Sequence, residues 1–313
     1  MRKFIISDLH GNGEVYDSIM AYLDNLSNEE EIELYINGDL IDDGFDAYRM
    51  ILDVKERIEG KGSVKIHFLG GNHEWMMYQA LKDRKPGKII DQNSDWMHCG
   101  GWTVEGELDQ LENYDEMCDA LRDFTGSLNI VHVFDEKILN KPILLVHGQA
   151  PKDVSLVQPL RIKDDTPQVF DAVWKREYEY GIFGISIIGT NRIGNDQYFT
   201  IVGNTPIDDP KGFDYRVKED DSYFNIDGGC HAYAKGYFDY DHVPLVEVKD
   251  NELSILVFNH NNEIISGYTF DGTTVPMSEE ELVQSRSFLN PELNGNGERN
   301  KQLLMELKRD GAL

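Results

Sequence analysis

Residues 1–10 read MRKFIISDLH, an apolar run that ends in two potential metal ligands, Asp8 and His10. The run from Lys3 to Ser7 predicts a short buried strand. The two ligands follow at its carboxyl end, which is the edge where open α/β sheets hold their ligands. Residues two apart on an extended backbone point to the same side, so a carboxylate and an imidazole at this spacing can share one metal ion. The alternative is a plain turn in which Asp8 caps the following helix.

Three strand-and-helix units follow one another at the start of the chain. The apolar pattern predicts strands at 3–7, 32–36 and 64–69 and helices at 14–26, 45–58 and 75–82. The second strand ends in Gly38 and Asp39, and the third runs into Gly71-Asn72-His73-Glu74. Because the strands of successive βα units lie parallel, their carboxyl ends meet, and we expect all three polar clusters at one edge of a sheet.

The rest of the chain has a less regular pattern. Residues 84–128 are predicted to form an inserted helical lobe over the site, and a helix is predicted at 171–180. Further strands are predicted at 130–134, 141–146, 183–188, 198–202 and 224–226, followed by a meander at 243–270. Two of these strands end in polar motifs, one in His147-Gly148 and the other in Gly203-Asn204-Thr205-Pro206.

The composition is strongly acidic, with 30 lysine and arginine residues against 57 aspartate and glutamate residues and a formal net charge of −27. This charge repels phosphate backbones and anionic lipid, so we expect neither nucleic acid nor a membrane as a partner. A protein of this charge that acts on phosphate must supply local positive charge, which favours bound cations. The three cysteines show neither disulfide nor zinc spacing, and no apolar run approaches the ~20 residues of a membrane span, so a cytoplasmic location is expected.

Five short motifs in chain order resemble those of the calcineurin-like metallophosphoesterases, most closely the branch of the serine/threonine phosphoprotein phosphatases and their bacterial relatives. The motifs are D-x-H at Asp8, G-D at Gly38, G-N-H-E at Gly71, H-G at His147 and G-x-T-P at Gly203. The resemblance implies an α/β fold, a sandwich of two mixed β-sheets flanked by helices with the active site at the carboxyl ends of the strands. We expect residues 1–275 to form the catalytic domain and residues 276–313 a helical tail.

The resemblance also implies a site for two divalent cations. Hydrolysis of a phosphate ester requires a nucleophile at neutral pH and stabilisation of charge on the phosphoryl group, and two cations about 3.5 to 4 Å apart supply both. By resemblance, one metal takes Asp8, His10 and Asp39, and the second shares Asp39 and takes Asn72, His147 and Asn204. This mixture of oxygen and nitrogen ligands suits Mn²⁺, Fe or Zn²⁺ better than Ca²⁺, and we expect Mn²⁺.

His73 is the residue next to a metal ligand in the motif, so on a tight loop it is expected to face away from the metals and toward the leaving group. In the family pattern the equivalent histidine is a general acid, and the carboxylate that orients it matches Asp42. A carboxylate partner raises the pKa of a histidine and sets its tautomer, as protonation of an alkoxide requires. The alternative is that His73 only caps the helix at Trp75.

Three positions depart from the family pattern. Asn204 stands where the G-x-T-P loop of the family has a histidine, and an amide oxygen binds a transition metal more weakly than an imidazole does. Asp43 and Gly70 stand where the protein phosphatases have two arginines that hold the phosphate. We therefore expect Arg176, in a W-K-R-E stretch similar to the W-x-R-E of bacterial relatives, to bind the phosphate.

Two alternatives concern substrate binding. Arg176 is equally well explained as a surface charge of a helix that pairs with Glu177 or Glu179. His231 follows Asp227-Gly228-Gly229-Cys230, which resembles the late active-site loop of the family, and we expect it to line the substrate pocket.

The leading hypothesis is a dinuclear-metal phosphoesterase that hydrolyses phosphomonoesters, similar to a bacterial serine/threonine protein phosphatase and acting on a phosphoprotein or a small phosphoester. One alternative is a hydrolase of dinucleoside polyphosphates, similar to the symmetrical diadenosine tetraphosphatases. The other is a metal-binding relative that lost turnover through Asn204. The oligomeric state is not indicated by the sequence.

Overall fold

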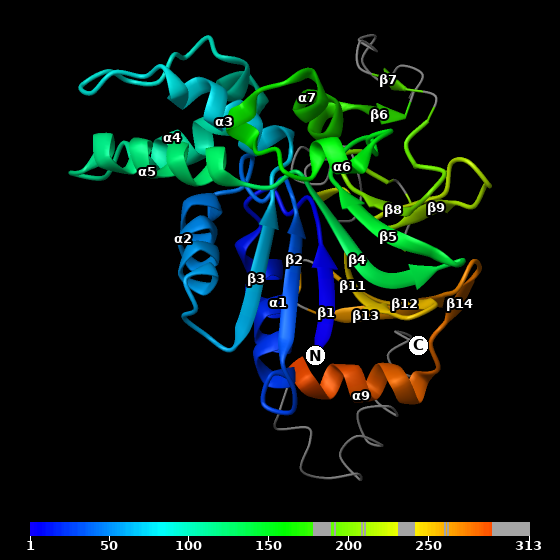
Figure 1. Cartoon of the computed structure of the whole chain (residues 1–313). Coiled ribbons are helices and arrows are strands. Elements are labelled where there is room, and N and C mark those ends of the chain that lie inside the picture. Colours follow the sequence, from blue (N-terminus) through cyan, green and yellow to red (C-terminus); the bar gives the residue numbers. More distant parts are fainter. Residues whose placement is uncertain are drawn as a thin grey trace.

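The structure, a computed structural model, describes residues 1–177, 189–190, 192–207, 209, 211–230, 242–259, 261 and 263–289. Two mixed β-sheets pack on one another, with helices on their outer faces (Figure 1). This arrangement confirms the predicted sandwich. The predicted strand at 183–188 and residues 290–313 of the predicted tail lie outside the described residues.

The larger sheet carries the three βα units. Its strands are β1 (Arg2–Ile6), β2 (Ile32–Asn37), β3 (Val64–Leu69), β11 (Val243–Lys249), β12 (Glu252–Phe258), β13 (Ile264–Phe270) and β14 (Thr274–Pro276), in the order β14-β13-β12-β11-β1-β2-β3. As predicted, β1, β2 and β3 are parallel neighbours, and the stretch at 243–270 forms an antiparallel meander. The meander joins the sheet through β11, which pairs antiparallel with β1.

The smaller sheet contains β4 (Val131–Ile138), β5 (Lys141–Val146), β8 (Phe199–Val202), β9 (Asp214–Arg216) and β10 (Tyr223–Asn225), in the order β4-β5-β8-β10-β9. Side chains alternate between the faces of a strand, and this alternation divides the core. On β1, Ile5 packs toward the smaller sheet with Leu145 and Ile201, whereas Phe4 and Ile6 pack toward the helices. The inner cluster consists mostly of aliphatic and phenylalanine side chains, and their packing holds the two sheets face to face.

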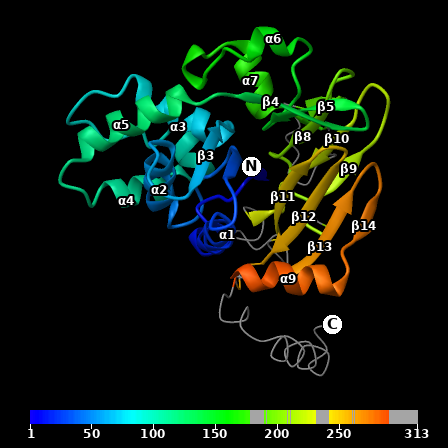
Figure 2. The same cartoon turned by 60° about the horizontal axis from the view of Figure 1, so that its bottom comes forward.

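The described helices are α1 (Gly13–Leu26), α2 (Ala47–Ile58), α3 (Asn72–Lys82), α4 (Trp102–Leu108), α5 (Tyr114–Ser127), α6 (Val154–Val157), α7 (Pro167–Trp174) and α9 (Glu279–Leu289). Helices α4 and α5 belong to the predicted lobe and lie beside α2 and α3, away from the meander (Figure 2). Helix α9 begins at a capping box, where the Ser278 hydroxyl donates to Glu281 Oε2 at 2.7 Å. It packs against α1 and β13, so this part of the tail covers the domain.

Two local predictions were wrong. Asp8 and His10 do not continue an extended strand, because β1 ends at Ile6 and both residues have φ near the left-handed region, 55° and 46°. The predicted helix at 171–180 ends at Trp174, because Lys175 is already extended. Arg176 consequently lies on the short strand β6 (Arg176–Glu177), which pairs with β7 (Gly189–Thr190).

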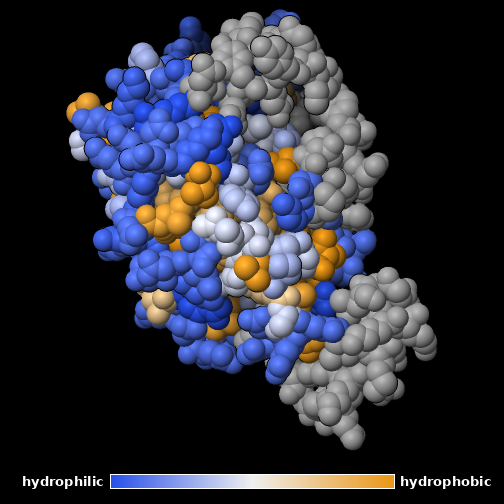
Figure 3. Space-filling view, turned by 90° about the vertical axis from the view of Figure 1, so that its right-hand side faces the viewer, coloured by the Kyte–Doolittle hydropathy of each residue, from blue (hydrophilic) through white to orange (hydrophobic). Residues whose placement is uncertain are grey.

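Much of the surface is hydrophilic. Figure 3 shows one side of the molecule, where hydrophilic residues surround a central region of intermediate hydropathy with scattered apolar residues. None of the helices in the described part of the chain combines the length and the apolar character that a membrane crossing requires.

A buried carboxylate on β2 provides a prediction about stability. Glu33 accepts hydrogen bonds from Lys65 Nζ at 2.6 Å and from the Tyr35 hydroxyl at 3.1 Å, and His67 Nε2 lies 3.3 Å away. Burial alone raises the pKa of Glu33, but these three partners lower it to about 2. Because the folded pKa lies below the ordinary 4.5, the stabilisation is present above that value and is lost as the pH falls toward about 2.

We therefore expect Glu33→Gln to lower the free energy of unfolding by about 1–2 kcal/mol at neutral pH. Urea unfolding at several pH values measures this, and the deficit relative to the unmutated chain is expected to shrink as the pH falls from about 5 toward about 2. The exposed pair of Lys61 and Glu56 offers a control, since Glu56→Gln removes an ion pair that water screens. A deficit that does not change with pH contradicts the assignment.

Candidate active site

The loops after β1 and β2 hold Asp8, His10 and Asp39 in place. All three have φ between 46° and 55°, so the backbone turns sharply at each of them. The loops are bonded to each other, with Asp8 N donating to Gly38 O at 3.2 Å and His10 N donating to Asp39 O at 3.0 Å. The loop after β8 approaches so closely that a Cβ at Gly203 would collide with Asp8. Glycine is therefore required there, which explains the first residue of the G-x-T-P motif.

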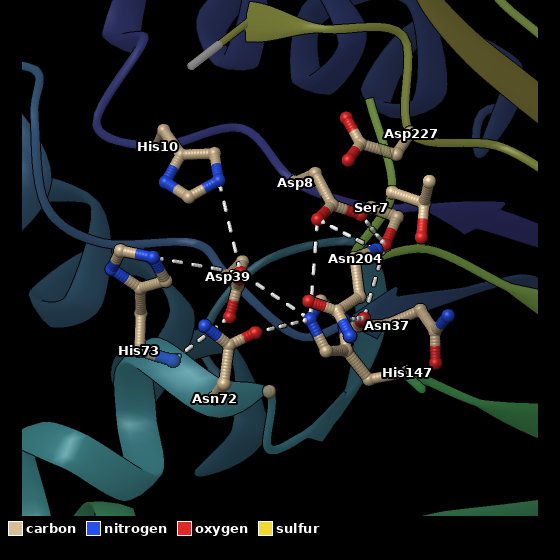
Figure 4. A network of polar contacts seen from close by, with 12 residues as sticks. Ser7, Asp8, His10, Asn37, Asp39, Asn72, His73, His147, Asn204 and Asp227 are labelled. Carbon is tan, nitrogen blue, oxygen red and sulfur yellow. Dashed lines mark hydrogen bonds and ion pairs between the residues drawn. The ribbon is translucent and has the colours of Figure 1, made fainter. Parts of the chain in front are cut away.

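Asp39 is the centre of the side-chain cluster (Figure 4). Its Oδ2 lies 3.2 Å from His147 Nε2, 3.7 Å from His10 Nε2 and 3.9 Å from His73 Nε2. Burial favours protonation, but the surrounding histidines hold the pKa of Asp39 well below its usual range. Two groups with the spacing of a metal site share this carboxylate, namely Asp8, Asp39 and His147, and His10, Asp39 and His73.

His147 is oriented by the backbone of β2. Its Nδ1 lies 2.7 Å from Asn37 O, and because a carbonyl oxygen only accepts, Nδ1 carries the proton and Nε2 faces the cluster. Nε2 also lies 3.0 Å from Asn72 Oδ1. Burial lowers the pKa of His147, yet the charges of Asp39 and Asp8 raise it to about 10. Without a cation, a protonated His147 supplies the positive charge that balances Asp39 and Asp8. A metal ion bound between these carboxylates would supply the same charge.

Asp8 is buried close to two other carboxylates, those of Asp39 and Asp227. Its oxygens accept hydrogen bonds from the Ser7 hydroxyl and from Asn204 N, the latter at 3.0 Å. Burial and the nearby carboxylates of Asp227 and Asp39 raise the pKa of Asp8 well above its usual range. Buried carboxylates packed this closely need positive charge between them, and the oxygen and nitrogen donors present suit divalent transition metals. The residues therefore fit the metal centre that the motifs imply.

His73 forms a buried pair with Asp42 at the edge of the cluster. Its Nδ1 lies 2.7 Å from Asp42 Oδ2, and Trp96 Nε1 donates to both oxygens of Asp42 at 2.9 Å. Burial lowers the pKa of His73, but Asp39 and Asp42 raise it to about 9, whereas burial raises the pKa of Asp42 to about 6. His73 lies in the first turn of α3, and its Nε2 faces Asp39. The expectation that it faces away from the cluster was therefore wrong.

Glu74 connects the loops after β2 and β3, a role that was not predicted from the sequence. The side chain is fully buried and accepts N–H bonds from Asp39 at 2.8 Å, Leu40 at 3.0 Å and Gly71 at 2.9 Å. The bond from Gly71 is half of a capping box, and it explains why α3 begins at Asn72 and not at the predicted residue 75. The signal that could have identified it is the glutamate three residues after Gly71, the spacing of a capping box.

The residues at the three departures lie as follows. Asn204 is buried beside Asp8, and its Oδ1 accepts a hydrogen bond from Arg176 Nη2 at 2.8 Å. Asp43 Oδ2 lies 3.9 Å from His10 Nδ1. A Cβ at Gly70 would lie 2.6 Å from Ile162 Cδ1, so Ile162 fills the space that a side chain there would need. His231 lies outside the described residues.

The structure thus brings nine of the predicted side chains into one region, and eight of them are buried. The buried ones are Asp8, His10, Asp39, Asp42, Asn72, His73, His147 and Asn204, and Arg176 reaches them through Asn204. Ser7, Asn37 and Trp96 were not predicted, because a serine, an asparagine or a tryptophan outside a motif carries no distinctive sequence signal.

Comparison with known proteins gives both a family and a fold. The family model described as calcineurin-like phosphoesterase matches residues 1–289. A protein serine/threonine phosphatase from Saccharomyces cerevisiae has a similar structure, with a TM-score of 0.50 and 14% identity over 79% of this chain and 72% of that chain. A cold-active protein-tyrosine phosphatase from a psychrophilic Shewanella species gives a TM-score of 0.46 and 13% identity, covering 88% of this chain and 80% of that chain. A search of curated proteins finds no match.

Proposed function

The chain belongs to the calcineurin-like phosphoesterase family, whose members are metal-dependent hydrolases, and from this premise we propose that it hydrolyses phosphomonoesters with the help of two divalent cations. The observation that carries the proposal is the convergence of two potential metal sites on one carboxylate, Asp39. A carboxylate shared in this way is the natural bridge of a two-metal site.

From the resemblance to the family we assign the first metal to Asp8, His10 and Asp39, and the second to Asp39, Asn72 and His147. The two geometric groups share Asp39 in the same way but place Asp8 with His147 and His10 with His73. The sequence-based prediction that Asn204 is a further ligand of the second metal stays open. Mn²⁺ is the proposed metal, because the donors mix carboxylate and amide oxygens with imidazole nitrogens. When bound, the two cations would lower the pKa of water and offset charge on the phosphoryl group.

In the proposed mechanism His73 is the general acid. An oxygen from water forms a bond to phosphorus as the water releases one proton to the solvent, and the phosphorus–oxygen bond of the ester breaks with its electron pair remaining on the leaving oxygen. His73 Nε2 gives its proton to that oxygen, since Nδ1 is held by Asp42 at 2.7 Å. The charge of Asp42 favours the protonated imidazole, and Trp96 keeps Asp42 in place from the other side.

Arg176 is the proposed phosphate-binding residue. A guanidinium donates paired N–H groups to phosphate oxygens, and it places a fixed positive charge in a region of many carboxylates. The described contact of Arg176 is with Asn204 Oδ1, at 2.8 Å, and the side chains of Glu177 and Glu179 lie outside the described part of the structure. His231 stays a predicted pocket residue, and the cytoplasm stays the predicted location.

The substrate class can be tested with a panel of phosphorylated compounds. The Mn²⁺-loaded chain is expected to release phosphate from phosphoserine and phosphotyrosine peptides and from an aryl phosphate, as measured by a phosphate-release assay. Turnover of a dinucleoside polyphosphate with none of the phosphomonoesters would contradict the proposal and support the alternative hydrolase.

A further inference from the structure

Both ends of the Asn204 amide are engaged. Its Oδ1 accepts from Arg176 Nη2 at 2.8 Å, and its Nδ2 donates to Trp174 O at 3.0 Å. The two contacts assign the amide orientation, since a guanidinium only donates and a carbonyl only accepts. The Asn204 side chain is buried, with 3% of its surface exposed, and its two hydrogen bonds are partly buried.

The backbone of Asn204 is tied to the metal-ligand cluster. Its N–H donates to Asp8 Oδ1 at 3.0 Å, and the preceding residue, Gly203, donates its N–H to His147 O at 2.9 Å. One residue therefore connects the proposed phosphate-binding arginine to a proposed ligand of the first metal. Its φ of 64° holds the backbone in a conformation that asparagine tolerates better than most side chains.

The same contacts disfavour ligation by Asn204. A carbonyl oxygen that accepts from a guanidinium lies next to a full positive charge, and a dication on that oxygen would be repelled by it. Turning the amide to present Oδ1 to a metal would break the bond to Arg176 and place the Nδ2 donors elsewhere. Because the Asn204 side chain is buried, water would not fully replace the hydrogen bonds that the amide makes to Arg176 and to Trp174 O, and the turn would cost free energy.

We propose that Asn204 is a positioning residue that fixes the Arg176 guanidinium beside the metal-ligand cluster for binding of a phosphoryl group, and that it does not ligate the second metal. Where the G-x-T-P loop of the family has a histidine that binds a metal, this chain then has an asparagine that holds Arg176 in place. The proposal rests on the proposed function in one respect, that the site binds a phosphoryl group.

A double-mutant cycle tests this inference, with inorganic phosphate as the probe. The variants are Asn204→Gly, which leaves the backbone unstrained at positive φ, Arg176→Ala and the double variant. Calorimetry gives the dissociation constant of phosphate for each Mn²⁺-loaded protein, and elemental analysis gives the bound Mn²⁺. We expect Asn204→Gly to weaken phosphate binding about 10-fold at unchanged Mn²⁺ content, and to add nothing in the Arg176→Ala background.

Asn204→His separates the two roles further, because it restores an imidazole and removes the acceptor for Arg176. We expect it to weaken phosphate binding as Asn204→Gly does, even if it binds Mn²⁺ more tightly. Asn195→Ala is the matched control, since Asn195 is a buried amide that donates to Pro151 O at 2.7 Å and belongs to neither the Asn204 loop nor the metal-ligand cluster. It is expected to lower the melting temperature without changing the dissociation constant of phosphate.

Three results would overturn the inference. They are loss of one Mn²⁺ in Asn204→Gly, an additive effect of Asn204→Gly in the Arg176→Ala background, and a complete lack of phosphate binding by the unmutated chain. An unmutated chain that binds phosphate as expected but hydrolyses no phosphomonoester would contradict the proposed function alone.

Discussion

Asp39→Asn is expected to reduce Mn²⁺ binding at both proposed sites and to bring phosphomonoester hydrolysis down to the level of the metal-free protein. Asp39 is the carboxylate that both potential metal groups share, and its Oδ2 lies within 3.9 Å of three imidazoles. An asparagine keeps the shape but loses the negative charge that bridges two cations. Elemental analysis of bound Mn²⁺, together with a phosphate-release assay, measures the effect.

The control for this substitution is Asp17→Asn, which removes an exposed carboxylate that pairs with Arg49 on the surface. It is expected to change neither Mn²⁺ content nor turnover. Melting temperatures without metal show whether Asp39→Asn still folds. If the folded variant retains both Mn²⁺ ions and its activity, Asp39 does not bridge the metals and the site assignment fails.

The second large effect is expected for His73→Asn, with a size that depends on the leaving group. Loss of a general acid costs roughly 10²- to 10⁴-fold in rate when the leaving group is a poor one. We therefore expect a loss of this order in kcat for phosphoserine peptides and a far smaller loss for an aryl phosphate such as 4-nitrophenyl phosphate, whose leaving phenolate needs no proton.

His73 also belongs to one of the two potential metal groups, so its role as an acid must be separated from ligation. Bound Mn²⁺ is expected to be unchanged in His73→Asn, and the exposed His98→Asn serves as a control for the loss of an imidazole. A loss of Mn²⁺, or an equal loss of rate on both kinds of ester, would make His73 a ligand or a substrate-binding residue instead of the acid.

Much of the fold is predictable from the sequence because the local signals agree with the tertiary structure. The apolar runs of β1, β2 and β3, each followed by an amphipathic helix, allow only a few arrangements once the strands are parallel. Their polar ends then have to meet, and Asp8, Asp39 and Asn72 do meet in one cluster. The meander at 243–270 follows equally directly from alternation and turn residues.

The remaining features depend on contacts between distant segments, which a local pattern does not contain. The left-handed backbone at Asp8 and His10 exists because neighbouring loops bond to one another at the sheet edge. Trp96 reaches Asp42 from the inserted lobe, 54 positions along the chain. The contact between Arg176 and Asn204 joins β6 to the loop after β8, so its effect on the expected ligand set could be seen only in three dimensions.

The most direct test of the central claim is a titration of the metal-free chain with Mn²⁺, in which bound metal and hydrolysis of 4-nitrophenyl phosphate are followed together. A metal-dependent phosphomonoesterase is predicted to be inactive without metal and to gain activity in parallel with the binding of two Mn²⁺ ions. Full occupancy by Mn²⁺ without hydrolysis of this ester or of a phosphopeptide would contradict the account.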